Sequence, residues 1–296
     1  MTPVALLMLL ATTVIWGWTF VLVKEGMSHV GPLTFLAARF ILAFALLALL
    51  FNRSIRRITL RTLTYGTAIG VVLFLGYFFQ TWGLVYTTAT KSGLITGLSV
   101  IIVPILSYAM FRDRVGLPAW GGILLAILGL LLLVFGKGAL TAVNVGDLLT
   151  LLCAIGFALH ILFIDRFVRS VDYRQLLVAQ VGAVALLSLI GAACVETLPV
   201  AYPSDLLRSV VVTGLAATAL ALYVLNRFQA YSTATYTAII LTMEPVFAGL
   251  FGFLLLGETL ASTQILGAVL ILLGTALPLT ERFRKRQRET RASSDP

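Results

Sequence analysis

A few charged or amide side chains lie inside the long apolar stretches of this 296-residue chain. The ionisable ones are Arg39, His160 and Glu244, and the amides Gln80 and Asn226 accompany them. A charged side chain at the centre of a bilayer costs roughly 2.5–3.5 kcal/mol to insert on translocon scales. Groups that persist there commonly contact a substrate or relay protons, so we predict that these five belong to a binding site.

Arg39 and Glu244 suit the two ends of a zwitterion. The guanidinium fork matches a carboxylate, and the carboxylate of Glu244 could receive a substrate amine or a proton. At 1.5 Å per residue, Arg39 lies roughly 10 Å below one membrane surface and Glu244 roughly 13 Å above the other, in a core about 30 Å thick. We hypothesise that they meet each other, or one substrate, between helices. The alternative is that carbonyls, hydroxyls or snorkelling satisfy each separately.

Other side chains could complete this site. Trp16, Tyr77 and Trp82 lie deep in their stretches and could surround a small organic ligand, with Tyr223 as a further aromatic candidate. Interfacial belts account for Trp and Tyr near the ends of spans. His160 is a candidate proton carrier, since histidine titrates near neutral pH; the alternative is a packed histidine bonded to a neighbouring helix. The two amides could donate hydrogen bonds to a ligand or join helices.

The composition excludes a soluble domain. It is 60% hydrophobic and 11% charged, with a mean hydropathy of +1.04, whereas soluble domains are roughly 45–50% apolar and about 25% charged. The apolar runs are roughly twenty residues long, as membrane helices require, and lack the alternation of barrel strands. We therefore predict an all-α membrane protein with ten spans. They are Val4–Val23, Leu33–Phe51, Tyr65–Val85, Ser92–Phe111, Pro118–Gly136, Gly146–Ile164, Leu176–Val195, Ser209–Gln229, Tyr236–Leu256 and Ser262–Thr280.

The chain contains an internal repeat. Residues Tyr86–Thr90, with the sequence YTTAT, align without a gap with Tyr231–Thr235, YSTAT, 145 residues later. The register continues through Asp113 and Glu258, Gly122 and Gly267, and Gly129 and Gly274. We predict a first repeat over residues 1–138, a second over residues 139–280 and a basic cytoplasmic tail over residues 281–296.

The distribution of Lys and Arg predicts the orientation. With a cytoplasmic N-terminus, the outer segments contain only Lys24, Lys91, Lys137 and Arg208, and the other loops and the tail contain the remaining Lys and Arg residues outside the spans. This asymmetry favours both termini in the cytoplasm, and it explains the net charge of +9 without a nucleic-acid partner. Each half has an odd number of spans, so the second repeat is inverted. Inverted repeats are typical of secondary transporters, with the substrate between the two copies.

These motifs resemble the EamA-type branch of the drug/metabolite transporter superfamily. The resemblance rests on the paired YTTA and YSTA segments, Trp16-Gly17, Glu244-Pro245, Gly257-Glu258 and the helix with Gly267 and Gly274. The first half departs from the pattern at Ser99-Val100, Pro104 and Asp113. The resemblance implies a ten-helix inverted repeat that exports amino acids or related small metabolites, without specifying one substrate.

Several alternatives stay open. Within the superfamily, the substrate could instead be a nucleoside, an organic cation or drug, or a lipid carrier. Gly97-Leu98-Ser99 with His160 leaves an intramembrane serine protease as a remote alternative. No nucleotide-binding loop or metal-ligand cluster is present in the sequence, so we expect no catalytic residue, metal or cofactor. The expected partners are a small-molecule substrate and the lipid bilayer of a bacterial inner membrane; proton coupling and a homodimer remain open.

Overall fold

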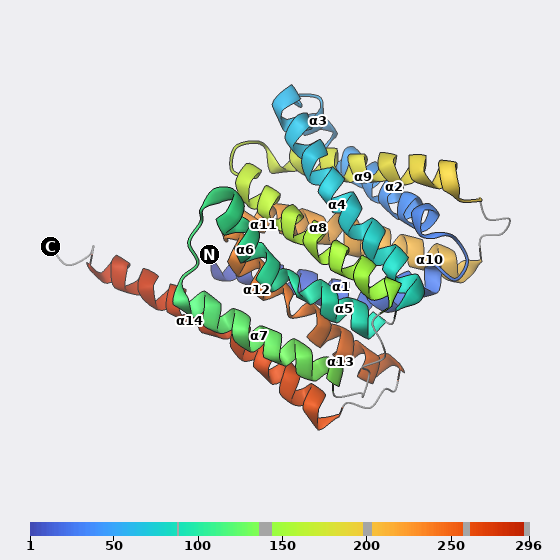
Figure 1. Cartoon of the computed structure of the whole chain (residues 1–296). Coiled ribbons are helices and arrows are strands. Elements are labelled where there is room, and N and C mark those ends of the chain that lie inside the picture. The colour runs from blue at the N-terminus through green and yellow to red at the C-terminus, as the bar shows by residue number, and fades with distance from the viewer. Residues whose placement is uncertain (88, 136–143, 198–202, 257–260, 293–296) are drawn as a thin grey trace.

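The computed structural model describes residues 1–87, 89–135, 144–197, 203–256 and 261–292. This part of the chain is a bundle of helices without a β-strand. The N-terminus and the last described residues, up to 292, lie at one end of it, which we call the terminal end (Figure 1). The predicted boundary between residues 138 and 139 lies outside the described residues, as does the hinge pair Gly257-Glu258.

The helices follow the expected spans. In the first half they are α1 (Pro3–Gly26), α2 (Pro32–Leu50), the short α3 (Asn52–Ile55), α4 (Leu60–Tyr86), α5 (Ala89–Gly97), α6 (Ser99–Phe111) and α7 (Leu117–Phe135). In the second half they are α8 (Val145–Phe167), α9 (Tyr173–Val195), α10 (Ser204–Val212), the π-helix η1 (Thr213–Leu220), α11 (Ala221–Gln229), α12 (Ala234–Leu241), α13 (Glu244–Leu256) and α14 (Ser262–Ala292).

The fold class is confirmed. Among the described residues, nine helical segments are long and apolar enough to cross a membrane, and Leu117–Leu133 is a shorter tenth. The eighth span differs from the prediction, because it begins at Ser204 and contains the π-helix η1. A π-helical segment inside a longer helix is rare and commonly marks a functional position.

Two spans that the sequence predicts as single helices are broken near their middles. The fourth divides into α5 and α6 at Leu98, and the ninth divides into α12 and α13 at Met243, the residue 145 positions later. Pro245 explains the second break, because proline lacks an N–H and is tolerated in the first turn of a helix but not in its interior. As a result, Glu244 is the first residue of α13.

The two halves pack as an inverted pair. The first helix of each half contacts the third helix of the other: α1 packs on η1 and α11, and α8 packs on α4. The second helices, α2 and α9, pack on each other, and α1 and α8 also contact the broken fourth helix of the opposite half. Every one of these contacts has its counterpart, so the interface between the halves has a pseudo-two-fold axis.

Helices α7 and α14 show the same symmetry at single residues. A Cβ atom placed on Gly122 would lie 2.5 Å from the Gly274 carbonyl oxygen, and one on Gly129 would lie 2.5 Å from that of Gly267. Gly122 aligns with Gly267 in the repeat, and Gly129 aligns with Gly274. Equivalent glycines therefore exchange partners across the axis, and small residues let the two backbones approach closely.

We expect Gly129→Val to destabilise the protein, because its side chain would collide with the α14 backbone and separate the two helices. Overpacking of this kind typically costs about 1–3 kcal/mol. Gly249→Val is the matched control, since no atom of another element lies within 4 Å of a Cβ at Gly249 while the change in intrinsic helix propensity is the same. Thermal unfolding in detergent should give a lower midpoint for Gly129→Val only; equal midpoints would contradict this account of the interface.

Candidate functional site

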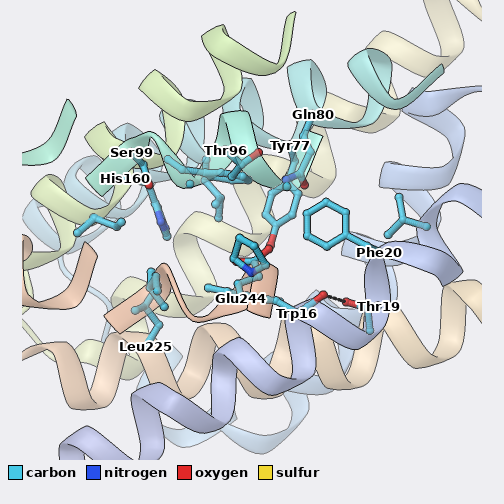
Figure 2. Close-up of a pocket in the computed structure, with 18 of the residues that line it drawn as sticks. Trp16, Thr19, Phe20, Tyr77, Gln80, Thr96, Ser99, His160, Leu225 and Glu244 are labelled. Carbon is cyan, nitrogen blue, oxygen red and sulfur yellow. Dashed lines mark hydrogen bonds between the residues drawn. The ribbon is translucent and has the colours of Figure 1, made fainter. Parts of the chain in front are cut away.

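A cavity lies between the two halves, with walls from α1, α2, α4, α5 and α6 on one side and α8, α11, α12 and α13 on the other (Figure 2). The volume open to the centre of a water molecule is about 70 Å³. A buried water needs about 10–15 Å³ by this measure, so several waters or a small metabolite can fit. The polar or aromatic lining includes Trp16, Thr19, Arg39, Tyr77, Gln80, Thr96, Ser99, His160, Thr242 and Glu244.

Glu244 enters the cavity at the break between α12 and α13. Neither carboxylate oxygen takes a hydrogen bond from a described residue, and neither is shielded from the cavity. Gly17 sets this position, because a Cβ there would lie 2.8 Å from both the Glu244 carbonyl oxygen and the Ala248 nitrogen. The Trp16-Gly17 motif thus lets α1 approach the first turn of α13.

Arg39 reaches the cavity from α2 and is only 3% exposed. Its Nε donates to the Thr218 Oγ1 at 2.6 Å, and the Thr218 hydroxyl donates to the Thr213 carbonyl at 2.9 Å. The guanidinium carbon lies 4.8 Å from the ring centroid of Tyr77, a cation–π contact. These contacts with Thr218 and Tyr77 orient the guanidinium at the wall of the cavity.

Arg39 and Glu244 line the same cavity without neutralising each other. Among the side chains that the structure describes, no ion pair within 4.0 Å joins them. The direct contact that we hypothesised is therefore absent here. The cavity instead presents a guanidinium and a carboxyl group at separate points of its wall.

The π-helix η1 holds two of these residues in place. Thr218, which accepts from Arg39, belongs to η1, and the carbonyl of Ala217 next to it accepts a 2.8 Å hydrogen bond from the Trp16 indole. The indole N–H is thereby satisfied by the protein, so Trp16 can contribute apolar ring contacts to the cavity but no hydrogen bond. In Figure 2, Trp16, Tyr77, His160 and Glu244 surround one space.

His160 also faces the cavity, and its Nε2 lies 2.9 Å from the side-chain oxygen of Gln180. Gln180 donates to the Asn226 Oδ1 at 2.7 Å. Gln180 lies in the predicted seventh span, and sequence reasoning missed it. The sequence could have indicated Gln180, because an amide inside an apolar span needs a hydrogen-bond partner.

Three predicted site residues do not line this cavity. Trp82 is 42% exposed and packs on Phe78, on a side of α4 away from the cavity. Tyr223 stacks on Phe51, and Asn226 is buried against Gln180. Neighbouring positions on a helix point about 100° apart. Tyr223 and Asn226 each follow a cavity-lining residue by one position, which turns their side chains away.

The 145-residue repeat register relates cavity-lining positions that could not be recognised from single residue types. In α4, α5 and α6, five positions line the cavity together with their partners 145 residues later. The pairs are Tyr77 and Leu222, Gln80 and Leu225, Thr96 and Leu241, Gly97 and Thr242, and Ser99 and Glu244. The cavity therefore lies on the pseudo-two-fold axis. The chemistry of the cavity is asymmetric, because leucines occupy the positions of the second repeat that are equivalent to Tyr77, Gln80 and Thr96.

Known proteins resemble this chain over both of its halves. A sequence profile of the EamA-like transporter family matches residues 3–135 and again residues 144–280. A protein of Archaeoglobus fulgidus called an uncharacterized transporter is 34% identical over 263 residues, covering 89% of this chain and 82% of the relative.

Two further relatives have more specific names. The S-adenosylmethionine/S-adenosylhomocysteine transporter of Chlamydia muridarum is 25% identical over 96% of this chain and 94% of its own length. The probable amino-acid metabolite efflux pump of Salmonella typhimurium is 26% identical over 90% of this chain and 91% of its own length.

Proposed function

This chain belongs to the EamA-like transporter family, and we propose that it is a secondary transporter which exports amino acids or related zwitterionic metabolites. The observation that carries the proposal is that a guanidinium and a carboxyl group line one cavity at separate points. Arg39 offers outer guanidinium nitrogens that suit a carboxylate, and Glu244 offers a carboxylate that suits an ammonium group. An α-amino acid has both groups on one carbon.

The packing supports alternating access. Cavity-lining residues Val23, Leu84 and Gly93 lie near the ends of α1 and α4 and the start of α5, all away from the terminal end. Toward the terminal end, the largest hydrophobic core cluster fills the bundle, with Leu9, Leu47 and Leu177 among its members. A smaller core cluster, with Phe20, Phe35 and Leu206 among its members, packs the opposite end. The breaks at Leu98 and Met243 give each half a point of bending beside the site.

A second candidate substrate is an amino acid linked to a nucleoside. Trp16, Tyr77 and Phe157 all line the cavity and could stack on a base. A relative is named for S-adenosylmethionine and S-adenosylhomocysteine, which both contain an α-amino-carboxylate group. This candidate uses the same two charged residues.

Counterflow in proteoliposomes tests the proposal. Vesicles loaded with an unlabelled amino acid should accumulate the same labelled amino acid in a saturable way, and S-adenosylmethionine belongs in the panel. Parallel runs with and without a pH gradient distinguish proton coupling from facilitated exchange. Trp82→Phe is the matched control and should transport like the unchanged protein, because Trp82 does not line the cavity. Folded protein that accumulates no zwitterion would contradict the proposal.

A further inference from the structure

His160 ends a chain of hydrogen bonds that crosses three helices of the second half. Its Nε2 lies 2.9 Å from Gln180 Oε1 on α9, and Gln180 Nε2 donates to Asn226 Oδ1 on α11 at 2.7 Å. Asn226 Nδ2 then donates to the Leu222 carbonyl at 2.9 Å. All three side chains are buried, so each depends on these partners.

The Leu222 carbonyl determines which group donates and which accepts in each of these hydrogen bonds. A backbone carbonyl can only accept, so Asn226 must turn its NH₂ group toward it and its oxygen toward Gln180. Gln180 must then donate to Asn226 with its own NH₂ group, which leaves its oxygen facing His160. Two acceptors cannot bond each other, so the proton between Gln180 and His160 belongs to His160 Nε2.

The other ring nitrogen of His160, Nδ1, is available to a molecule in the cavity. Nδ1 of His160 has no hydrogen-bond partner among the described residues and is not shielded from the cavity that the ring lines. In neutral histidine the nitrogen without a proton is an acceptor. The Leu222 carbonyl on α11, acting through the side-chain amides of Asn226 and Gln180, thus makes His160 Nδ1 a hydrogen-bond acceptor for a bound molecule.

We propose that Gln180 and Asn226 are positioning residues that hold His160 in its Nε2–H tautomer, so that Nδ1 accepts a hydrogen bond from the substrate. This rests on the proposed function and narrows it. The preferred zwitterion has an N–H or O–H donor on its side chain, directed at His160. A substrate side chain that ends in an acceptor would place its lone pair against the lone pair of His160 Nδ1.

The tautomer can be measured without transport. The chain has two histidines, so a His29→Gln background leaves His160 as the only histidine signal. In full-length protein labelled with ¹⁵N- and ¹³C-histidine in bilayers at neutral pH, nitrogen–proton and nitrogen–carbon correlation spectra should show a proton on Nε2 and none on Nδ1. Gln180→Leu and Asn226→Leu should give a mixture of tautomers.

Gln175→Leu is the matched control for these spectra. Gln175 is also a buried glutamine of α9, but it donates to the Ser54 carbonyl and belongs to no contact with His160. It should leave the His160 signals unchanged. A proton on Nδ1 in the unsubstituted protein would overturn the proposal, as would identical spectra for Gln180→Leu and the control.

Binding competition tests the predicted substrate class. Glutamine has a donating side-chain amide, whereas methionine sulfoxide has the same number of side-chain heavy atoms, is uncharged at that end and has only acceptors there. The protein should prefer glutamine by about tenfold, the order expected when one hydrogen bond is left unmade. Equal affinity for the two would overturn the substrate part. Failure of both to bind would count against amino-acid transport while the spectra still decide the tautomer.

Discussion

Arg39→Met is expected to lower amino-acid transport at least about a hundredfold while leaving the protein folded. Loss of a charge-assisted, two-point contact to a carboxylate accounts for a factor of this size. Folding should survive, because Arg39 has no carboxylate partner among the described residues and its removal strands no opposite charge. Thr218 keeps its hydrogen bond to the Thr213 carbonyl. Counterflow together with the thermal unfolding midpoint measures both effects.

The control for this prediction is a competitor that lacks the carboxylate. The amine formed by removing the carboxylate from the transported amino acid should bind the unchanged protein and Arg39→Met with similar affinity. Arg39→Lys should be intermediate, since it keeps the charge but loses the planar fork and the bond to Thr218. If Arg39→Met weakened the amine as much as the amino acid, Arg39 would have a structural role rather than a role in recognition.

Glu244→Gln is expected to weaken binding of the amino acid by about ten- to a hundredfold, because the amide cannot match the charge of an ammonium group. The side chain accepts no hydrogen bond from the described protein, so an isosteric amide leaves no protein donor unmatched. Binding affinity and counterflow rate should therefore fall at an unchanged unfolding midpoint.

A substrate analogue without the amine isolates this effect. The corresponding α-hydroxy acid should compete equally well against the unchanged protein and Glu244→Gln. If the variant instead keeps full counterflow but no longer responds to a pH gradient, Glu244 carries a proton and the assignment to the substrate amine is wrong. The two substitutions, each with its own analogue, thus separate the two ends of the zwitterion.

Much of the fold could be predicted because its determinants are local or periodic in the chain. Length and apolarity decide whether a segment can cross a bilayer, since lipid offers the backbone no hydrogen bonds. The 145-residue register that pairs Gly122 with Gly267 predicts a repeat, and the family profile matches each half in turn. The helix breaks were only partly predictable: Pro245 suggests a kink in the ninth span, whereas only the repeat register, and no proline beside it, marks Leu98 in the fourth.

The candidate site was harder to predict. Arg39, His160 and Glu244 stand out because charge is costly in lipid, and the structure brings all three to one cavity. The same reasoning does not distinguish Gln80, which lines the cavity, from Trp82, which lies outside it. In a soluble helix, polar residues would mark the outer face, but a membrane helix is apolar on all sides.

The sequence by itself therefore determined the class of protein, the repeat and the few side chains costly enough to need a function. Only the tertiary structure decided how those side chains are used. It keeps Arg39 and Glu244 apart, supports Arg39 and Trp16 on a π-helix, and orients His160 through Gln180 and Asn226. The physical reason is that these contacts join helices far apart in the chain. Which atoms meet depends on how every helix is rotated in the packed bundle.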